Sequence, residues 1–178
     1  IELDNNLWIA HIKIANIFFA KGDIEKSLEI YTDIKEKTEN TEDPYCARAI
    51  EGIGGIHWYY NEHDVALQYF KLSLDLNKKL NNKQGVGFLL RNIGYHYCER
   101  NEFSRALDYF QQSLKIKEEI DDKIGIGWEF HAISSVFILQ WDLDTALEYE
   151  QKAQSIIEKL DTNVAKAWIY FRLGNIYE

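Results

Sequence analysis

Two groups of closely spaced glycines are the first residues of this chain that could do chemistry, because glycine-rich loops bind phosphate. Gly52, Gly54 and Gly55 form one group, and Gly85 and Gly87 form the other. A phosphate-binding loop requires a preceding strand and a following Lys-Ser or Lys-Thr pair, and neither group has them. Both groups lie within helical patterns. The sequence therefore argues against nucleotide binding and indicates glycines that let helices pack closely.

Histidines are the next candidates, as metal ligands or as bases. A helical metal site uses two histidines four residues apart, and none of His57, His63 and His96 has such a partner. Cys98 lies two residues from His96, and residues two apart on a helix point in different directions. We therefore expect structural histidines, no metal site and no cofactor. We also expect no enzyme activity, because no nucleophile has a base spaced to activate it.

Composition narrows the class of partner. The chain has 178 residues, 46% of them hydrophobic, which is ample for a buried core. Its formal net charge of −9 argues against nucleic acid or an anionic membrane as the main ligand. No apolar run approaches the roughly 20 residues of a membrane span. Cys46 and Cys98 fall at different places in the pattern described next, so we expect no disulfide framework and a reducing, cytoplasmic setting.

A dipeptide of a small residue and leucine recurs along the chain and reveals the elements that carry these residues. Its copies begin at Ser27, Ala66, Ala106 and Ala146, with separations of 39, 40 and 40 residues. A period in this range indicates a stack of supersecondary units that bury their apolar faces against one another. Apolar residues three and four apart within each unit predict two amphipathic helices, and no strand pattern competes. The predicted units are residues 4–40, 44–80, 83–120 and 123–160, followed by a lone helix at 163–178.

The turns between helices follow the same period. Gly22, Asn61 and Asn101 occupy the turn inside the first three units, where a left-handed backbone ends a helix. Trp141 occupies this place in the fourth unit, so we expect a turn of different shape there. The chain contains no Met, and its helical pattern runs to its last residue, so we interpret it as a fragment of a longer array. The predicted N-caps of the first helices of units two to five are Asp43, Asn82, Asp122 and Thr162.

The pattern resembles that of the tetratricopeptide repeat family. Unit three carries a small residue, an aromatic, a turn residue, an alanine and a second aromatic at the family's spacing, in Gly94, Tyr97, Asn101, Ala106 and Phe110. The 39- to 40-residue spacing is similar to that of Leu-Gly-Asn repeat scaffolds, kinesin light chains and bacterial peptide-sensing regulators. The resemblance implies one all-α domain, a right-handed α-α superhelix, or solenoid, of helix-turn-helix repeats. It also implies that the first helix of each pair lines a concave groove.

A second stripe on each first helix lies about a third of a turn from the core stripe and identifies the residues that would line this groove. Aromatic and arginine side chains dominate it, and these types anchor protein partners. The alternative is that the aromatics, such as Phe88, Trp128 and Trp168, pack against adjacent helices. The predicted groove residues are Ile9, Ile12, Asn16, Phe19, Arg48, Glu51, Trp58, Phe88, Arg91, Tyr95, Trp128, His131, Ser135, Trp168, Phe171 and Asn175.

These residues lead to a hypothesis about the ligand. Asn16 and Asn175 can each donate to and accept from a peptide backbone. Arg48, Arg91 and His131 could bind a carboxylate. The sequence thus favours a non-enzymatic scaffold that binds a peptide or protein segment with apolar anchors and at least one acidic group. A peptide-sensing regulatory domain acting on an effector outside this segment is a second hypothesis. Self-assembly into homo-oligomers is a third, through the repeat end that carries Ile169, Leu173 and Ile176.

One charge does not fit the repeat. Glu150 stands where the other units have an aromatic residue at a core position. Two explanations remain open from the sequence. Either the packing of the fourth unit differs locally, or its second helix turns this side chain outward.

Overall fold

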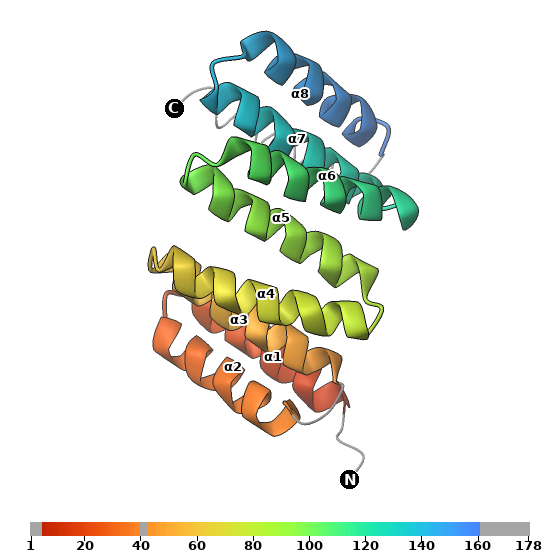
Figure 1. Cartoon of the computed structure of the whole chain (residues 1–178). Helices are drawn as coiled ribbons and strands as arrows, with labels where there is room; N and C mark the ends of the chain where they lie inside the picture. Colours follow the sequence, from red (N-terminus) through yellow and green to blue (C-terminus); the bar gives the residue numbers. More distant parts are fainter. Residues whose placement is uncertain (1–4, 40–42, 161–178) are drawn as a thin grey trace. The chain divides into compact units, whose positions relative to one another are not determined.

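Eight helices make up the described part of the chain, and no strand occurs in it. The structure is a computed structural model that describes residues 5–39 and 43–160. The all-α fold class is confirmed, and the described helices follow one another in pairs (Figure 1). The helices are α1 Asn5–Ala20, α2 Ile24–Thr38, α3 Pro44–Tyr59, α4 His63–Lys79, α5 Lys83–Glu99, α6 Phe103–Glu119, α7 Lys123–Leu139 and α8 Leu143–Ile157.

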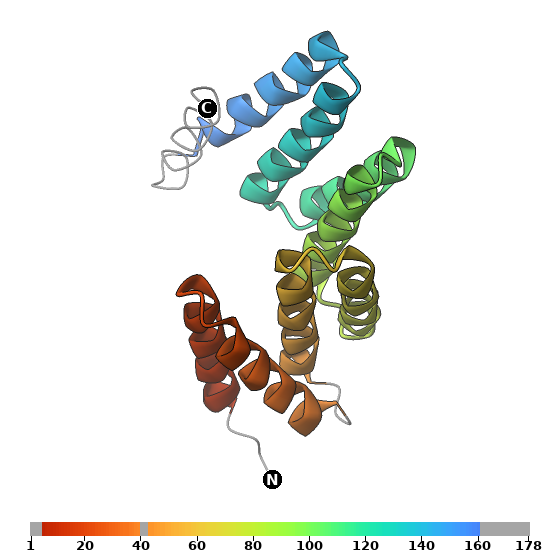
Figure 2. The same ribbon diagram turned by 90° about the vertical axis from the view of Figure 1, so that its left-hand side faces the viewer.

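The chain divides into two compact units, residues 1–96 and 97–178. Unit 1 contains α1 to α4 and most of α5. Unit 2 contains α6 to α8 and the last residues of α5. Figure 2 shows α7 and α8 of unit 2 as an antiparallel pair joined by a tight turn. The lone helix predicted at 163–178 lies outside the described residues.

The turns inside the pairs have the predicted left-handed backbone, with φ of 82° at Gly22, 60° at Asn61 and 58° at Asn101. The prediction for the fourth turn is wrong. Trp141 has φ of 61°, and its turn makes the same two backbone hydrogen bonds as the turn at Asn101. The Trp141 ring is 86% exposed, so a bulky side chain can stand on this backbone without meeting another helix.

The predicted helix caps are confirmed where the structure describes them. The side-chain oxygens of Asp43, Asn82 and Asp122 accept hydrogen bonds from backbone N–H groups of Tyr45, Gly85 and Gly125. Each bond satisfies one of the amides that the first turn of a helix leaves without a partner. The fourth predicted cap, Thr162, lies outside the described residues.

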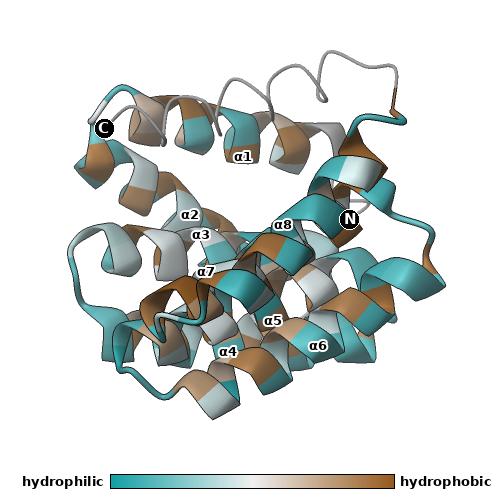
Figure 3. Ribbon diagram, turned by 90° about the horizontal axis from the view of Figure 1, so that it is seen from above, coloured by the Kyte–Doolittle hydropathy of each residue, from teal (hydrophilic) through white to brown (hydrophobic). Residues whose placement is uncertain are grey.

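Small residues bring the paired helices into close contact. Serine hydroxyls donate across the pairs to backbone carbonyls of the facing helix, Ser27 to Ala15, Ser73 to Ala47 and Ser134 to Ala146, at 2.7 to 2.9 Å. A Cβ placed on Gly54 would come within 2.8 Å of the Phe70 ring. Hydrophobic and hydrophilic residues alternate along the helices (Figure 3). Close packing thus explains this glycine, as the sequence predicts.

The core of unit 1 forms between its first three helices. Trp8, Ile12 and Ala15 of α1 pack with residues of α2 and α3, including Tyr31 and Ile53. Each of these five residues is at most 5% exposed. This packing fixes the first helices of the first two repeats side by side, which positions the residues of the second stripe.

Candidate functional site

A cleft of about 190 Å³ lies in unit 1, and six of the predicted groove residues line it. These six come from three different helices, α1, α3 and α5, so the repeat places the same stripe of successive first helices around one hollow. They are Ile12, Asn16, Phe19, Arg48, Glu51 and Phe88.

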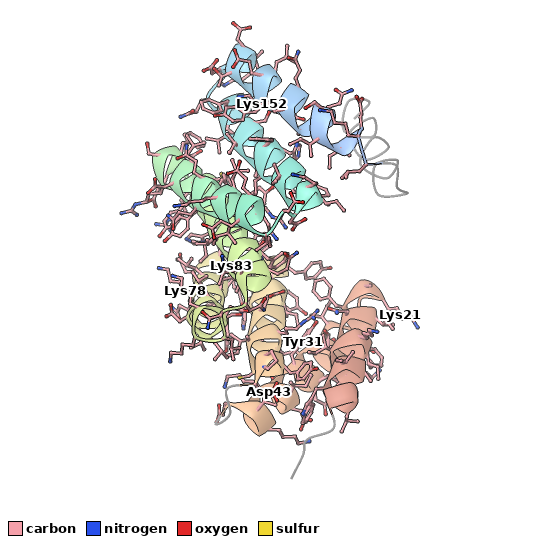
Figure 4. All side chains as sticks on the ribbon, turned by 90° about the vertical axis from the view of Figure 1, so that its right-hand side faces the viewer. Lys21, Tyr31, Asp43, Lys78, Lys83 and Lys152 are labelled. Atoms are coloured by element: carbon pink, nitrogen blue, oxygen red, sulfur yellow. The ribbon has the colours of Figure 1, made fainter. Side chains whose placement is uncertain are left out.

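Five further residues complete the cleft. Gly52, Gly55 and Asn92 belong to first helices. Tyr31 and Phe70 belong to the second helices α2 and α4, and reach the cleft from the repeat core. Figure 4 shows Tyr31 between the helices of the first repeat and α3. The periodicity of a single helix does not identify these two rings as cleft residues, because it places them in the core.

Four aromatic rings make the walls of the cleft apolar, namely those of Phe19, Tyr31, Phe70 and Phe88. Tyr31 is only 4% exposed, and its hydroxyl donates a 2.6 Å hydrogen bond to the Asn16 side-chain oxygen. This bond fixes the Asn16 amide at the edge of the cleft. Burial, the nearby Glu51 charge and, in the opposite direction, Arg48 together raise the pKa of Tyr31 to about 12, so it stays neutral.

Glu51 is the acidic group of the cleft. Burial raises its pKa to about 7, and the positive charge of Arg48 opposes this rise. Within the described residues, the Glu51 carboxyl makes no hydrogen bond and no salt bridge. Arg48 lies one helical turn earlier on α3, and its side chain is exposed. The cleft therefore combines aromatic walls, two asparagine amides and a carboxyl that changes charge near neutral pH.

The absence of a side chain at Gly55 helps to keep the cleft open. A Cβ on Gly55 would meet no heavy atom within 4 Å, whereas one on Gly52 would overlap the Tyr31 ring. Glycine in the middle of a helix costs about 1 kcal/mol relative to alanine. Gly52 is needed for close packing, but packing gives no reason for Gly55.

The remaining predicted residues of unit 1 lie outside this cleft. Ile9 is 38% exposed on α1, and Tyr95 is half-buried on α5. Trp58 packs edge-on against His63 and against His96, with ring centroids 4.5 and 6.5 Å apart. Trp58 thus follows the alternative in which aromatics of the stripe pack against neighbouring helices.

Arg91, also outside the cleft, stacks on one of its residues. The guanidinium carbon lies 5.4 Å from the centroid of the Phe88 ring, within the range of a cation–π contact. Arg91 is half-buried and lies on the same helix as Phe88. The contact shows that the aromatic edge of the cleft already accommodates a guanidinium.

The predicted groove residues of unit 2 contact other residues of the same unit. His131 Nδ1 lies 2.6 Å from Glu150 Oε1 across α7 and α8. The Ser135 hydroxyl donates to the His131 carbonyl oxygen on its own helix. Trp128 is half-buried against a cluster formed by Ala153 and Ile157.

Glu150 itself is buried, with 8% of its surface exposed. The helix does not turn it outward, so the packing of the fourth repeat differs locally: a histidine–glutamate contact occupies the place of an aromatic ring. Trp168, Phe171 and Asn175, the last predicted groove residues, lie outside the described residues.

Other hollows lie among the described residues, away from this cleft. One of about 760 Å³ lies in unit 1 between α1 and α2, on exposed charged residues such as Glu25 and Glu36. One of about 500 Å³ lies in unit 2 beside Phe130 and Leu160. Neither contains a residue of the predicted stripe. Within residues 5–39 and 43–160, no group of three metal-binding side chains occurs, and no helix is long and apolar enough to cross a bilayer.

Comparisons with known proteins agree with this fold. Residues 62–119 match the sequence model of the tetratricopeptide repeat. A comparison with curated protein sequences found no match. The predicted resemblance to the tetratricopeptide repeat is confirmed, and the match covers the chain from α4 to the end of α6.

Several solved structures are similar. BtubC (BKLC) from P. vanneervenii aligns with a TM-score of 0.75 and 18% identity, over 90% of this chain and 68% of that one. Aspartyl phosphate phosphatase F from Bacillus subtilis aligns with a TM-score of 0.81 and 14% identity, over 96% and 45%. The Rap conjugation gene regulator of the plasmid pLS20, solved in complex with the Phr* peptide, aligns with a TM-score of 0.70 and 18% identity, over 86% and 46%. The chain thus spans less than half the length of the last two proteins.

Proposed function

We propose that this chain is a non-catalytic scaffold that binds a segment of a peptide or protein in the cleft of unit 1. The observation that carries the proposal is the composition of that cleft. Aromatic walls supply apolar area at low cost in side-chain entropy, and Asn16 and Asn92 can each donate to and accept from a peptide backbone. A concave site with apolar walls and a few polar groups is typical of a ligand site.

The similar structures support the proposal without identifying the ligand. One of them, the Rap regulator of pLS20, was solved with a peptide bound. That regulator also supports a second candidate, a regulatory domain in which peptide binding controls an effector outside this segment. The net charge of −9 supports a partner that is neither a nucleic acid nor a membrane. Cys46 and Cys98 are both buried free thiols, which fits a reducing cytoplasm.

Gly55 gives a direct test, because a side chain there would fill the cleft without disturbing the core. Gly55→Leu should abolish binding of a random pentapeptide library immobilised on beads. The fold should be retained, since leucine favours the helix and no atom lies within 4 Å of its Cβ. Gln68→Leu, which adds the same side chain at an exposed position of α4, is the control and should bind like the wild type. Equal retention of both variants and the wild type would rule out the cleft as the site.

A further inference from the structure

The charge inside the cleft suggests a more specific ligand than the sequence does. We propose that the unit 1 cleft binds a cationic side chain, arginine or lysine, of an extended peptide, with Glu51 as its counter-ion and the aromatic walls around it. This inference rests on the proposed function and names the chemical class of its ligand. It replaces the acidic ligand that Arg48, Arg91 and His131 indicate in the sequence.

The position of the Glu51 carboxyl favours a cationic ligand. It lines the cleft, is largely removed from water, and makes no hydrogen bond or salt bridge with any described residue. A buried carboxylate is costly unless a cation or a hydrogen-bond donor accompanies it. A ligand with a guanidinium or ammonium group would supply both.

Four aromatic rings line the same cleft as the Glu51 carboxyl. The negative face of an aromatic ring attracts a cation within about 6 Å of its centroid. The cleft is lined by the rings of Phe19, Tyr31, Phe70 and Phe88. The guanidinium of Arg91 already lies over the Phe88 ring. A hollow that joins a carboxylate to several rings is therefore suited to a cation, and poorly suited to a second carboxylate.

Two of the three basic residues that would favour an acidic ligand lie outside the cleft. Arg91 lies over the Phe88 ring, and His131 is paired with Glu150 in unit 2. Arg48 alone among the three lines the cleft, and its side chain is exposed. Arg48 opposes a bound cation by repulsion, so its removal should strengthen binding. This expectation distinguishes the proposal from an acidic-ligand hypothesis, which expects the opposite.

Charged and titratable groups that face Glu51 are few. Arg48 lies on its own helix, and Tyr31, which stays neutral, faces it from α2. The lining residues of α1, α4 and α5 are uncharged, including Asn16 and Asn92. Because the Glu51 pKa lies at about 7, cation binding should strengthen as the pH rises from 6 to 8.

The experiment uses pools of N-acetylated, C-amidated pentapeptides on beads, with randomised flanks and one fixed central residue. The central residue is arginine, lysine, citrulline, norleucine or glutamate; citrulline and norleucine are neutral counterparts of the two bases. The arginine and lysine pools should retain the wild-type chain about tenfold better than their neutral counterparts. Glu51→Gln should remove this preference, and Arg48→Gln should increase it. Glu29→Gln, an exposed carboxyl of α2, is the control and should change nothing.

Each other outcome is decisive. Equal retention on the arginine and citrulline pools, or best retention on the glutamate pool, would overturn the cationic ligand. If, in either case, Gly55→Leu no longer binds the peptides that the wild type retains, the proposed function stands while this inference fails. Retention on no pool at all would contradict both.

Discussion

His131 and Glu150 face each other across the fourth helix pair, with 2.6 Å between Nδ1 and Oε1. The equivalent positions in the third repeat are Arg91 and Phe110, and Phe110 is fully buried. A polar contact has therefore replaced an aromatic ring at a position that is 8% exposed. Such a replacement makes each partner depend on the other, because a buried carboxylate without its donor is strongly unfavourable.

The first prediction follows from this dependence. His131→Leu should lower the free energy of unfolding by about 2–4 kcal/mol, because it leaves the Glu150 carboxylate without this donor. The double variant His131→Leu/Glu150→Phe, which restores an aromatic ring, should unfold within about 1 kcal/mol of the wild type. Urea denaturation followed by circular dichroism measures both. Equal losses in the single and the double variant would show that the contact itself is not what stabilises this pair.

The turn at Trp141 gives the second prediction. A left-handed backbone costs a residue with a Cβ roughly 1–2 kcal/mol, and asparagine tolerates it best after glycine. Because the Trp141 ring is 86% exposed, its removal loses little burial. Trp141→Asn should therefore raise the free energy of unfolding by about 1 kcal/mol, and Asn101→Trp should lower it by a similar amount. Thermal unfolding of the two variants and the wild type compares their stabilities. Destabilisation by Trp141→Asn would mean that contacts of the Trp141 ring stabilise the fold.

The repeat period explains how much of the fold could be predicted from the sequence. Turn residues such as Asn61 and Asn101, and capping residues such as Asp122, recur at fixed places and mark the helix ends through local backbone chemistry. Trp141 shows the limit of that reasoning. The two backbone hydrogen bonds of the turn and the packing of its helices impose the left-handed backbone even on an unsuitable residue.

The site was predictable only in part, for a geometric reason. The sequence predicts Glu51 and Phe88 as site residues, because a helix turns by about 100° per residue and this interval shows which residues share one face. Tyr31 and Phe70 reach the cleft from second helices, through the spaces left by Gly52 and Gly54. That arrangement depends on how helices pack, and so does the pairing of distant residues such as His131 and Glu150. Neither follows from a periodicity along one helix.

The pKa of Glu51 gives the third prediction. A carboxyl whose pKa is raised from 4.5 to about 7 in the folded chain binds its proton more tightly there than in the unfolded chain. Between these values the folded chain holds more protons, so this residue makes stability fall as the pH rises from about 5 to 7, with little further change above. Relative to Glu51→Gln, the wild type should lose about 1–3 kcal/mol between pH 5 and pH 8. Urea denaturation at several pH values tests this, and a difference between the two proteins that does not vary with pH would contradict the buried, titrating carboxyl.

Lys117 and Asp122 give the last prediction. Lys117 is 3% exposed, and its Nζ lies 3.0 Å from Asp122 Oδ2, while Asp122 also caps α7 through Gly125. Asp122→Ala removes the counter-ion of a buried ammonium and the cap together, and should cost about 3–5 kcal/mol. One repeat earlier, Asn77 and Asn82 form an uncharged version of the same contact, with 2.7 Å between Asn82 Nδ2 and Asn77 Oδ1.

The chain thus supplies its own control for this pair. Lys117→Asn/Asp122→Asn should copy the Asn77–Asn82 contact, keep the cap on α7 and unfold within about 1 kcal/mol of the wild type in urea. The result would show that the turn between repeats needs a bonded polar pair, and that the charges add little to it because both must leave water. If the double variant is as unstable as Asp122→Ala, the ion pair itself stabilises the turn. The neutral Asn77–Asn82 pair would then stabilise its turn only in the surroundings of the earlier repeat.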